Sequence, residues 1–121
     1  MSVSKKVSMA RGEQALERPK GEMAVTLFRG KTGLTVRYQG RVIARTTSSK
    51  VGKLIAPCVA AALGVKLPAL GSTAEATVSS GVMFKVLSIA TLNSLNEESR
   101  ILLDYLLLEA REMRDYQSSE A

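Results

Sequence analysis

The residues of this chain that could do chemistry are almost all cationic. Seven of them fall between positions 29 and 53, namely Arg29, Lys31, Arg37, Arg41, Arg45, Lys50 and Lys53. Lysine and arginine side chains contact phosphates and give nucleic-acid affinity that is independent of sequence and falls with salt. We therefore expect these residues to form a nucleic-acid-binding surface, for DNA or RNA. A sheet face that is merely solvated is the alternative.

Other kinds of chemistry have little support in the sequence. The chain has no histidine and only one cysteine, Cys58, which excludes a Ser-His-Asp triad, a Cys-His dyad and a multi-cysteine zinc site. Cys58 lies in an apolar run and is expected to be a buried hydrophobic residue. The stretch Lys50–Leu54 contains Gly-Lys but lacks the other residues of a phosphate-binding loop. We expect no enzyme activity, no metal and no cofactor.

Charge is distributed unevenly along the chain. Residues 1–66 carry thirteen lysines and arginines against three glutamates, whereas residues 67–121 carry four against eight acidic residues. Such asymmetry predicts a polyanionic partner for the first half. Two other readings remain open, since the two halves could attract each other, or the basic half could meet an acidic protein surface.

The elements that must position these cations form one small domain. Residues 1–22 are polar and basic and are expected to be a flexible arm, either solvated or ordered on nucleic acid or a neighbouring subunit. Residues 23–121 are expected to fold as a single α+β domain. The longest apolar run, Leu54–Gly64, is too short to span a membrane, and residues 1–22 have no secretory h-region. We therefore expect a cytoplasmic protein with no membrane partner.

Residues 23–47 predict a three-stranded antiparallel meander. Its strands are Ala24–Phe28, Leu34–Tyr38 and Arg41–Thr46. A two-residue loop between the second and third strands would mix apolar and charged residues on one face. A three-residue loop with Gly40 as a bulge separates them, and we prefer it.

The preferred register has consequences for both faces of the meander. It places Val36 opposite Val42 and Leu34 opposite Ala44 on an apolar face. The other face would then carry Thr35, Arg37, Arg41, Ile43 and Arg45. The first of these faces is expected to pack against the C-terminal helices.

Three helical segments are considered after the meander. Residues 49–63 are expected to form a helix that begins at a Ser/Thr cap, ends at Gly64 and is kinked or split by Pro57. Residues 74–92 are undecided between strand and helix, with a helix over 82–92 favoured. Residues 96–117 form the clearest helix, with Asn96 as its cap.

The last helix is apolar over more than half of its circumference, which exceeds what one sheet face needs. The excess predicts a homo-oligomer. The expected interface residues are Ile101, Leu102, Tyr105, Leu106, Leu108 and Met113.

Together these features favour a small, basic, non-catalytic protein that binds nucleic acid as a homo-oligomer. The first alternative is a protein-interaction or structural module, either an inhibitor of a host protein or a coat subunit, because the predicted architecture resembles that of some small viral coat proteins. The second is a binder of a small anionic ligand such as a nucleotide, held at the start of the 49–63 helix.

Overall fold

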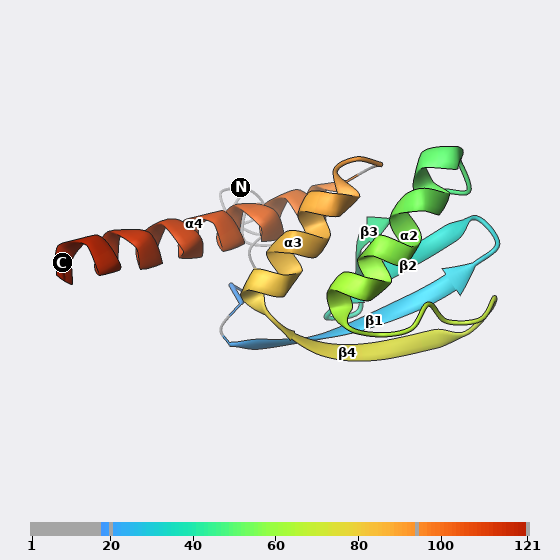
Figure 1. The fold of residues 1–121 in the computed structure, drawn as a ribbon, viewed down its shortest axis with the longest axis horizontal. Helices are drawn as coiled ribbons and strands as arrows, with labels where there is room; N and C mark the ends of the chain where they lie inside the picture. The colour runs from blue at the N-terminus through green and yellow to red at the C-terminus, as the bar shows by residue number, and fades with distance from the viewer. Residues whose placement is uncertain (1–17, 20, 94, 121) are drawn as a thin grey trace, which may run out of the picture.

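The computed structural model describes residues 18–19, 21–93 and 95–120. Its elements in chain order are β1 (Glu22–Gly30), β2 (Gly33–Tyr38), β3 (Arg41–Arg45), α2 (Lys50–Leu63), β4 (Thr73–Ser79), α3 (Ser80–Ala90) and α4 (Glu97–Glu120). The four strands form one antiparallel sheet in the order β3-β2-β1-β4, and α2 and α3 cover one of its faces (Figure 1). The predicted α+β class, with an N-terminal meander and C-terminal helices, is confirmed. The predicted arm lies almost entirely outside the described residues.

The undecided segment 74–92 contains both a strand and a helix. Alternate residues of β4 face the helices, because Ala74, Ala76 and Val78 pair with the inward-facing Leu27, Val25 and Met23 of β1. β4 therefore extends the meander at the β1 edge. Ser79 ends the strand, and its side chain accepts a hydrogen bond from the Val82 amide at 3.3 Å, which caps α3. The favoured helix over 82–92 is confirmed through residue 90.

The core lies between the sheet and the helices. Every second residue of β1 and β2 is buried, as the strand period requires, and the inner faces of the helices meet them. The most fully buried large side chains are Met23, Leu27, Leu34, Ile43, Met83, Leu87 and Leu102. None of the helices in the described part of the chain is long and apolar enough to cross a membrane.

The turn between β2 and β3 differs from the preferred register. Tyr38 pairs with Arg41 across a two-residue loop in which Gln39 and Gly40 both have left-handed φ, 54° and 76°. Such a loop matches the twist of the flanking strands. The extra residue lies further along, at Ile43, between the pairs Arg37–Val42 and Val36–Ala44. The predicted three-residue loop, and with it the pairings Val36–Val42 and Leu34–Ala44, is therefore wrong.

The bulge at Ile43 shows why neither an unbroken two-residue hairpin nor a bulged turn fits this sequence. An unbroken two-residue hairpin would place Ile43 directly opposite Val36, and a bulged turn would send Ile43 to the outer face. The observed extra residue in mid-strand lets Ile43 be fully buried while Ala44 also faces the core. The register thus keeps apolar side chains on the core face, as expected, but the bulge that makes this possible lies within β3 and not in the turn.

Helix α2 runs without interruption through Pro57, so the predicted split is wrong. Ser49 accepts a hydrogen bond from the Gly52 amide at 3.1 Å, and Gly64 ends the helix with a φ of 77°. Pro57 is exposed, where water can hydrate the carbonyl that loses its partner. Cys58 is exposed too, since α2 buries Ile55, Val59 and Leu63 on its other side, so the prediction of a buried thiol is also wrong.

Helix α4 begins against β3 and extends past the edge of the sheet (Figure 1). Leu102 and Leu106 are 0% and 3% exposed in the protomer's own core. Beyond them, Arg18 donates to Glu112 at 2.7 Å, and this bond and the attraction between the charges raise the pKa of Arg18. The start of the described chain therefore lies beside the projecting half of α4.

Candidate nucleic-acid interface

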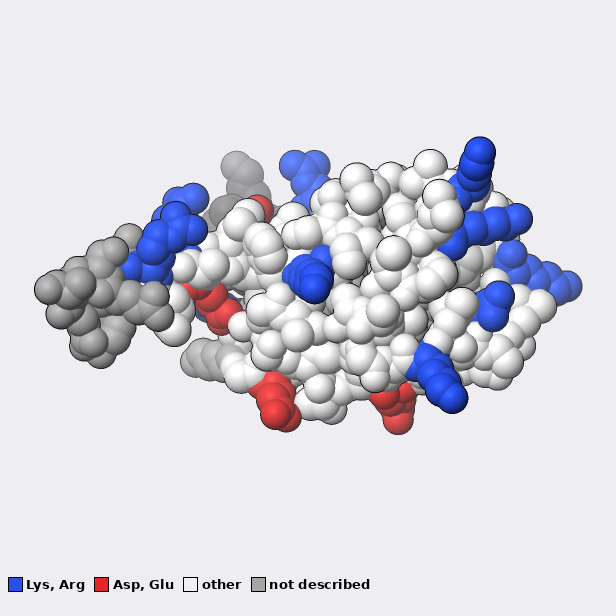
Figure 2. Space-filling view, viewed as in Figure 1, with Lys and Arg blue, Asp and Glu red and all other residues white. Residues whose placement is uncertain are grey.

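A pocket lies between the turn that joins β1 to β2 and the first turns of α2. This hairpin pocket has a volume of about 400 Å³. Its lining includes Arg29, Lys31 and Lys53, three of the seven predicted phosphate contacts, which are separated by up to 24 positions in the sequence. Figure 2 shows lysine and arginine side chains gathering over this end of the molecule. Lys50 is exposed at the first position of α2, one turn before Lys53.

Arg29, one of the residues that line the hairpin pocket, is held in place by three hydrogen bonds. Its amide donates to the Ser72 carbonyl at 3.0 Å, and its own carbonyl accepts from the Gly71 amide at 2.6 Å. Its guanidinium Nη1 donates to the Pro68 carbonyl at 3.1 Å. Arg29 therefore fixes the loop before β4 as one wall of the pocket, and part of its hydrogen-bonding capacity serves the fold.

Two glycines allow the hairpin and α2 to approach the chain that joins them. Gly33 has a φ of 138°, and a Cβ atom there would lie 1.7 Å from the Thr46 carbonyl oxygen. A Cβ atom on Gly52 would lie 2.1 Å from the Thr47 carbonyl oxygen. Both distances are far below van der Waals contact. The hairpin and α2 can therefore each lie this close to the segment of Thr46 and Thr47 only because Gly33 and Gly52 lack a side chain.

The segment between β3 and α2 is anchored at both of its threonines. Thr46 is buried; its amide donates to the Leu34 carbonyl at 2.9 Å, and its hydroxyl accepts from the Leu34 amide at 3.0 Å. The Thr47 amide donates to Oδ1 of Asn93 at 2.9 Å, which ties the segment to the end of α3. These bonds fix the start of α2 relative to the sheet.

The outer sheet face carries two of the predicted arginines, Arg37 and Arg45. Arg45 is paired with Thr35, which lies on the same face of β2 as Arg37, and both arginines are exposed. The face also carries acid, because β4 places Glu75 opposite Thr26, the partner of Arg37 on β1. The predicted arginine-bearing face thus exists with two arginines and is less basic than expected.

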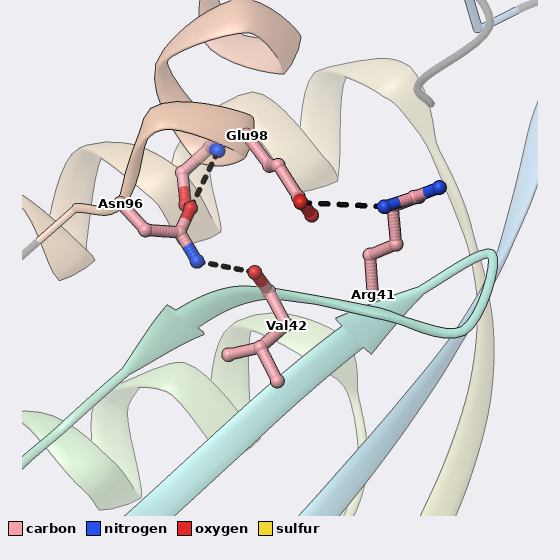
Figure 3. A network of polar contacts seen from close by, with 5 residues as sticks. Arg41, Val42, Asn96 and Glu98 are labelled. Carbon is pink, nitrogen blue, oxygen red and sulfur yellow. Dashed lines mark hydrogen bonds and ion pairs between the residues drawn. The ribbon is translucent and has the colours of Figure 1, made fainter. Parts of the chain in front are cut away.

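Arg41 does not belong to that face. It is paired with Tyr38, whose side chain is buried under the helices, so Arg41 lies on the helix side at the edge of the sheet. There its guanidinium meets the Glu98 carboxylate of α4 at 3.5 Å (Figure 3). The prediction that Arg41 and Ile43 share a face with Arg37 and Arg45 is therefore wrong, and its cause is the two-residue turn with its bulge in the strand.

The same edge of the sheet holds the start of α4. The Asn96 side chain accepts from the Ser99 amide at 2.8 Å and from the Ser99 hydroxyl at 2.6 Å, and its Nδ2 donates to the Val42 carbonyl (Figure 3). Asn96 thus caps α4 as predicted and also links the helix to β3. Together with the Arg41–Glu98 pair, it attaches an acidic helix start to a basic strand.

The structure shows where the charge asymmetry divides. Residues 22–96, which form the sheet, α2 and α3, carry nine lysines and arginines and two acidic residues, Glu22 and Glu75. From residue 97 onward seven acidic residues face three arginines. The basic part of the protein is therefore the whole sheet-and-helix body, and α4 is the acidic element.

Sequence reasoning missed the residues that complete the hairpin pocket around its cations. They are Leu34, Thr46, Thr47, Ala56, Pro57, Leu67 and Leu70. The only local signal was the pair of glycines in the turn at residues 30–33, which indicates a tight approach but does not say to what. No group of acidic or cysteine side chains in the described ranges could hold a metal ion.

Comparisons with protein-family models, with curated proteins and with solved structures found no match. The geometry of the protein itself therefore carries the functional argument.

Proposed function

We propose that this protein is a small, non-catalytic nucleic-acid-binding protein that contacts the phosphate backbone and acts as a homo-oligomer. The contact surface is the basic end formed by the hairpin turn and the start of α2, with Lys31, Lys50 and Lys53 as principal phosphate contacts. Arg37 and Arg45 on the outer sheet face extend this surface.

One observation carries the proposal. The body of residues 22–96 has nine cationic side chains against two carboxylates, and three of the cations, Arg29, Lys31 and Lys53, line the hairpin pocket at one end. This excess of positive charge attracts a polyanion. When lysines and arginines neutralise its phosphates, the nucleic acid releases counterions, which favours binding. A single small anion would need far less charge than this body carries. The arrangement is thus best suited to a phosphate backbone.

The first prediction concerns the salt dependence of binding. The double variant Lys31→Glu/Lys53→Glu should weaken binding to a mixed-sequence DNA or RNA by about tenfold or more, and should reduce the slope of log K against log salt by about two. Fluorescence anisotropy over a salt series from low to physiological concentration measures both quantities. A separate Arg37→Glu variant tests the contribution of the sheet face.

The matched control is Lys85→Glu/Arg100→Glu, which changes the net charge equally at two exposed positions on α3 and α4. It should leave the slope almost unchanged. Equal losses in the two double variants would show that only net charge matters, and no binding to DNA or RNA at low salt would exclude the proposed function.

The oligomeric part of the proposal rests on the projecting half of α4. Leu107, Leu108 and Met113 are 43%, 42% and 60% exposed there. Leu102 and Leu106, which the sequence assigned to an interface, lie in the core of the protomer instead, and Ile101 and Tyr105 are half-buried. An interface between copies would therefore be built from the far end of the helix.

The second prediction follows from that exposure. Sedimentation at micromolar concentration should show a dimer or larger assembly, and Leu107→Gln/Leu108→Gln should shift it toward the monomer by about tenfold in dissociation constant, since two half-exposed leucines on adjacent positions of α4 would be lost. The control is Leu54→Gln, which replaces a leucine of α2 that is 68% exposed. A wild-type protein that sediments as a monomer would contradict this part of the proposal.

A further inference from the structure

We propose that the hairpin pocket receives one unstacked base of a single-stranded nucleic acid, with the neighbouring phosphates on Lys31 and Lys53. This inference rests on the proposed function and adds to it a preference for single strands over duplexes. It assigns separate roles to the apolar interior of the pocket and to its cationic rim.

The first support is the distribution of polarity within the pocket. Lys31 and Lys53 are exposed at its rim and come from two different walls, the hairpin turn and α2. Between them the lining is largely aliphatic, with Pro57 and Ala56 from α2 and Leu70 from the loop before β4. A phosphate alone would gain nothing from such a surface. A ligand with an anionic group on either side of a flat, weakly polar ring would use both the cationic rim and the aliphatic interior.

The second support is size. A volume of about 400 Å³ lies within the range of pockets that hold small organic ligands. A base in a duplex is paired and stacked, and reaching a pocket costs the energy of flipping it out. A base in a single strand is already accessible, and apolar side chains can sandwich it in the same way that they hold flipped bases. A pocket that receives a single base therefore favours the single strand over the duplex.

The third support is that the walls are fixed before any ligand binds. The contact of Gly33 with Thr46 sets the hairpin wall, and the contact of Gly52 with Thr47 sets the α2 wall. The loop that carries Leu70 is attached to β1 by the Gly71 amide, which donates to the Arg29 carbonyl at 2.6 Å. Little further ordering is needed on binding, and preorganised sites of this kind lose less entropy.

The test compares a labelled single-stranded oligonucleotide with the same strand annealed to its complement, at one salt concentration, by fluorescence anisotropy. Two uncharged variants change the pocket without changing the electrostatics. Ala56→Leu fills it, and Leu70→Ala removes an apolar wall that is 62% exposed and so carries little risk to folding. Ala61→Leu is the matched control, because it adds the same side chain to an exposed position of the same helix. Thermal melting verifies that each variant is folded.

The wild type and Ala61→Leu should bind the single strand about tenfold more tightly than the duplex, the advantage expected from burying part of one base against aliphatic side chains. Ala56→Leu and Leu70→Ala should reduce single-strand affinity to that of the duplex and leave duplex affinity within about twofold. Equal wild-type affinity for both forms, or a single-strand preference that survives both variants, overturns the inference and leaves the proposed function standing.

Two further results would also decide the matter. A free mononucleotide that binds as tightly as the strand would overturn the inference in favour of a small-ligand site. Absence of binding to either form at low salt would overturn the proposed function together with the inference.

Discussion

Replacing Gly33 with alanine is expected to lower the free energy of unfolding by about 4 kcal/mol, the range reserved for severe steric and backbone defects. The added methyl group would lie 1.7 Å from the Thr46 carbonyl oxygen, and the φ of 138° is one that residues with a side chain rarely adopt. The clash is with backbone that is itself hydrogen-bonded to Leu34, so neither side can move without breaking the sheet. Urea unfolding followed by circular dichroism measures the loss.

Gly40→Ala separates the two causes of that loss. Gly40 also has a positive φ, 76°, but nothing lies within 4 Å of the position its Cβ would occupy. It should therefore cost only about 1 kcal/mol, from backbone strain alone. Similar losses for Gly33→Ala and Gly40→Ala would mean that the close approach of the hairpin to Thr46 is not a feature of the folded protein.

The second large effect is expected at Asn96. Asn96→Ala should destabilise the protein by about 3 kcal/mol, because one substitution removes a helix cap and leaves two donors of Ser99 without their acceptor. Ser99 is fully buried, so water does not replace the lost acceptor. The link from the Asn96 amide to the Val42 carbonyl of β3 is lost as well.

Asn96→Asp is the informative companion. A carboxylate still accepts from the Ser99 amide and hydroxyl but cannot donate to Val42, so the expected loss falls to about 1 kcal/mol. The difference between the two variants, measured by chemical denaturation at neutral pH, gives the contribution of the cap. Equal destabilisation by Asp and Ala would contradict the view that Asn96 acts mainly as the cap of α4.

The features predicted correctly from the sequence have local causes. Asn96 and the two glutamates that follow it mark the start of α4, and Ser49 and Gly64 mark the ends of α2, because caps depend on residues within one turn. The strands of the meander were visible in their alternation. The position of the extra residue in β3 could not be predicted from the sequence. Whether it lies in the turn or at Ile43 depends on which side chains the helices bury, and that is a long-range property.

The candidate site shows the same division. The cationic residue types were evident from the sequence, but their grouping was not, since a shift of one residue in pairing moved Arg41 to the opposite side of the sheet and next to Glu98. The loop that carries Leu67 and Leu70 read as a connector, because the hydrogen bonds between Arg29 and residues 68–72 that hold it beside the hairpin join distant parts of the sequence. Tertiary contacts of this kind leave no periodic signal in the sequence.

The exposed position of Cys58 offers a direct experimental handle. It is the only thiol of the chain, and it follows Pro57, which lines the hairpin pocket. A maleimide fluorophore or a nitroxide would therefore attach to the wild-type protein at one known position of α2, without mutagenesis. The distance between two such spin labels in an assembly would then measure how far apart the two copies of α2 lie.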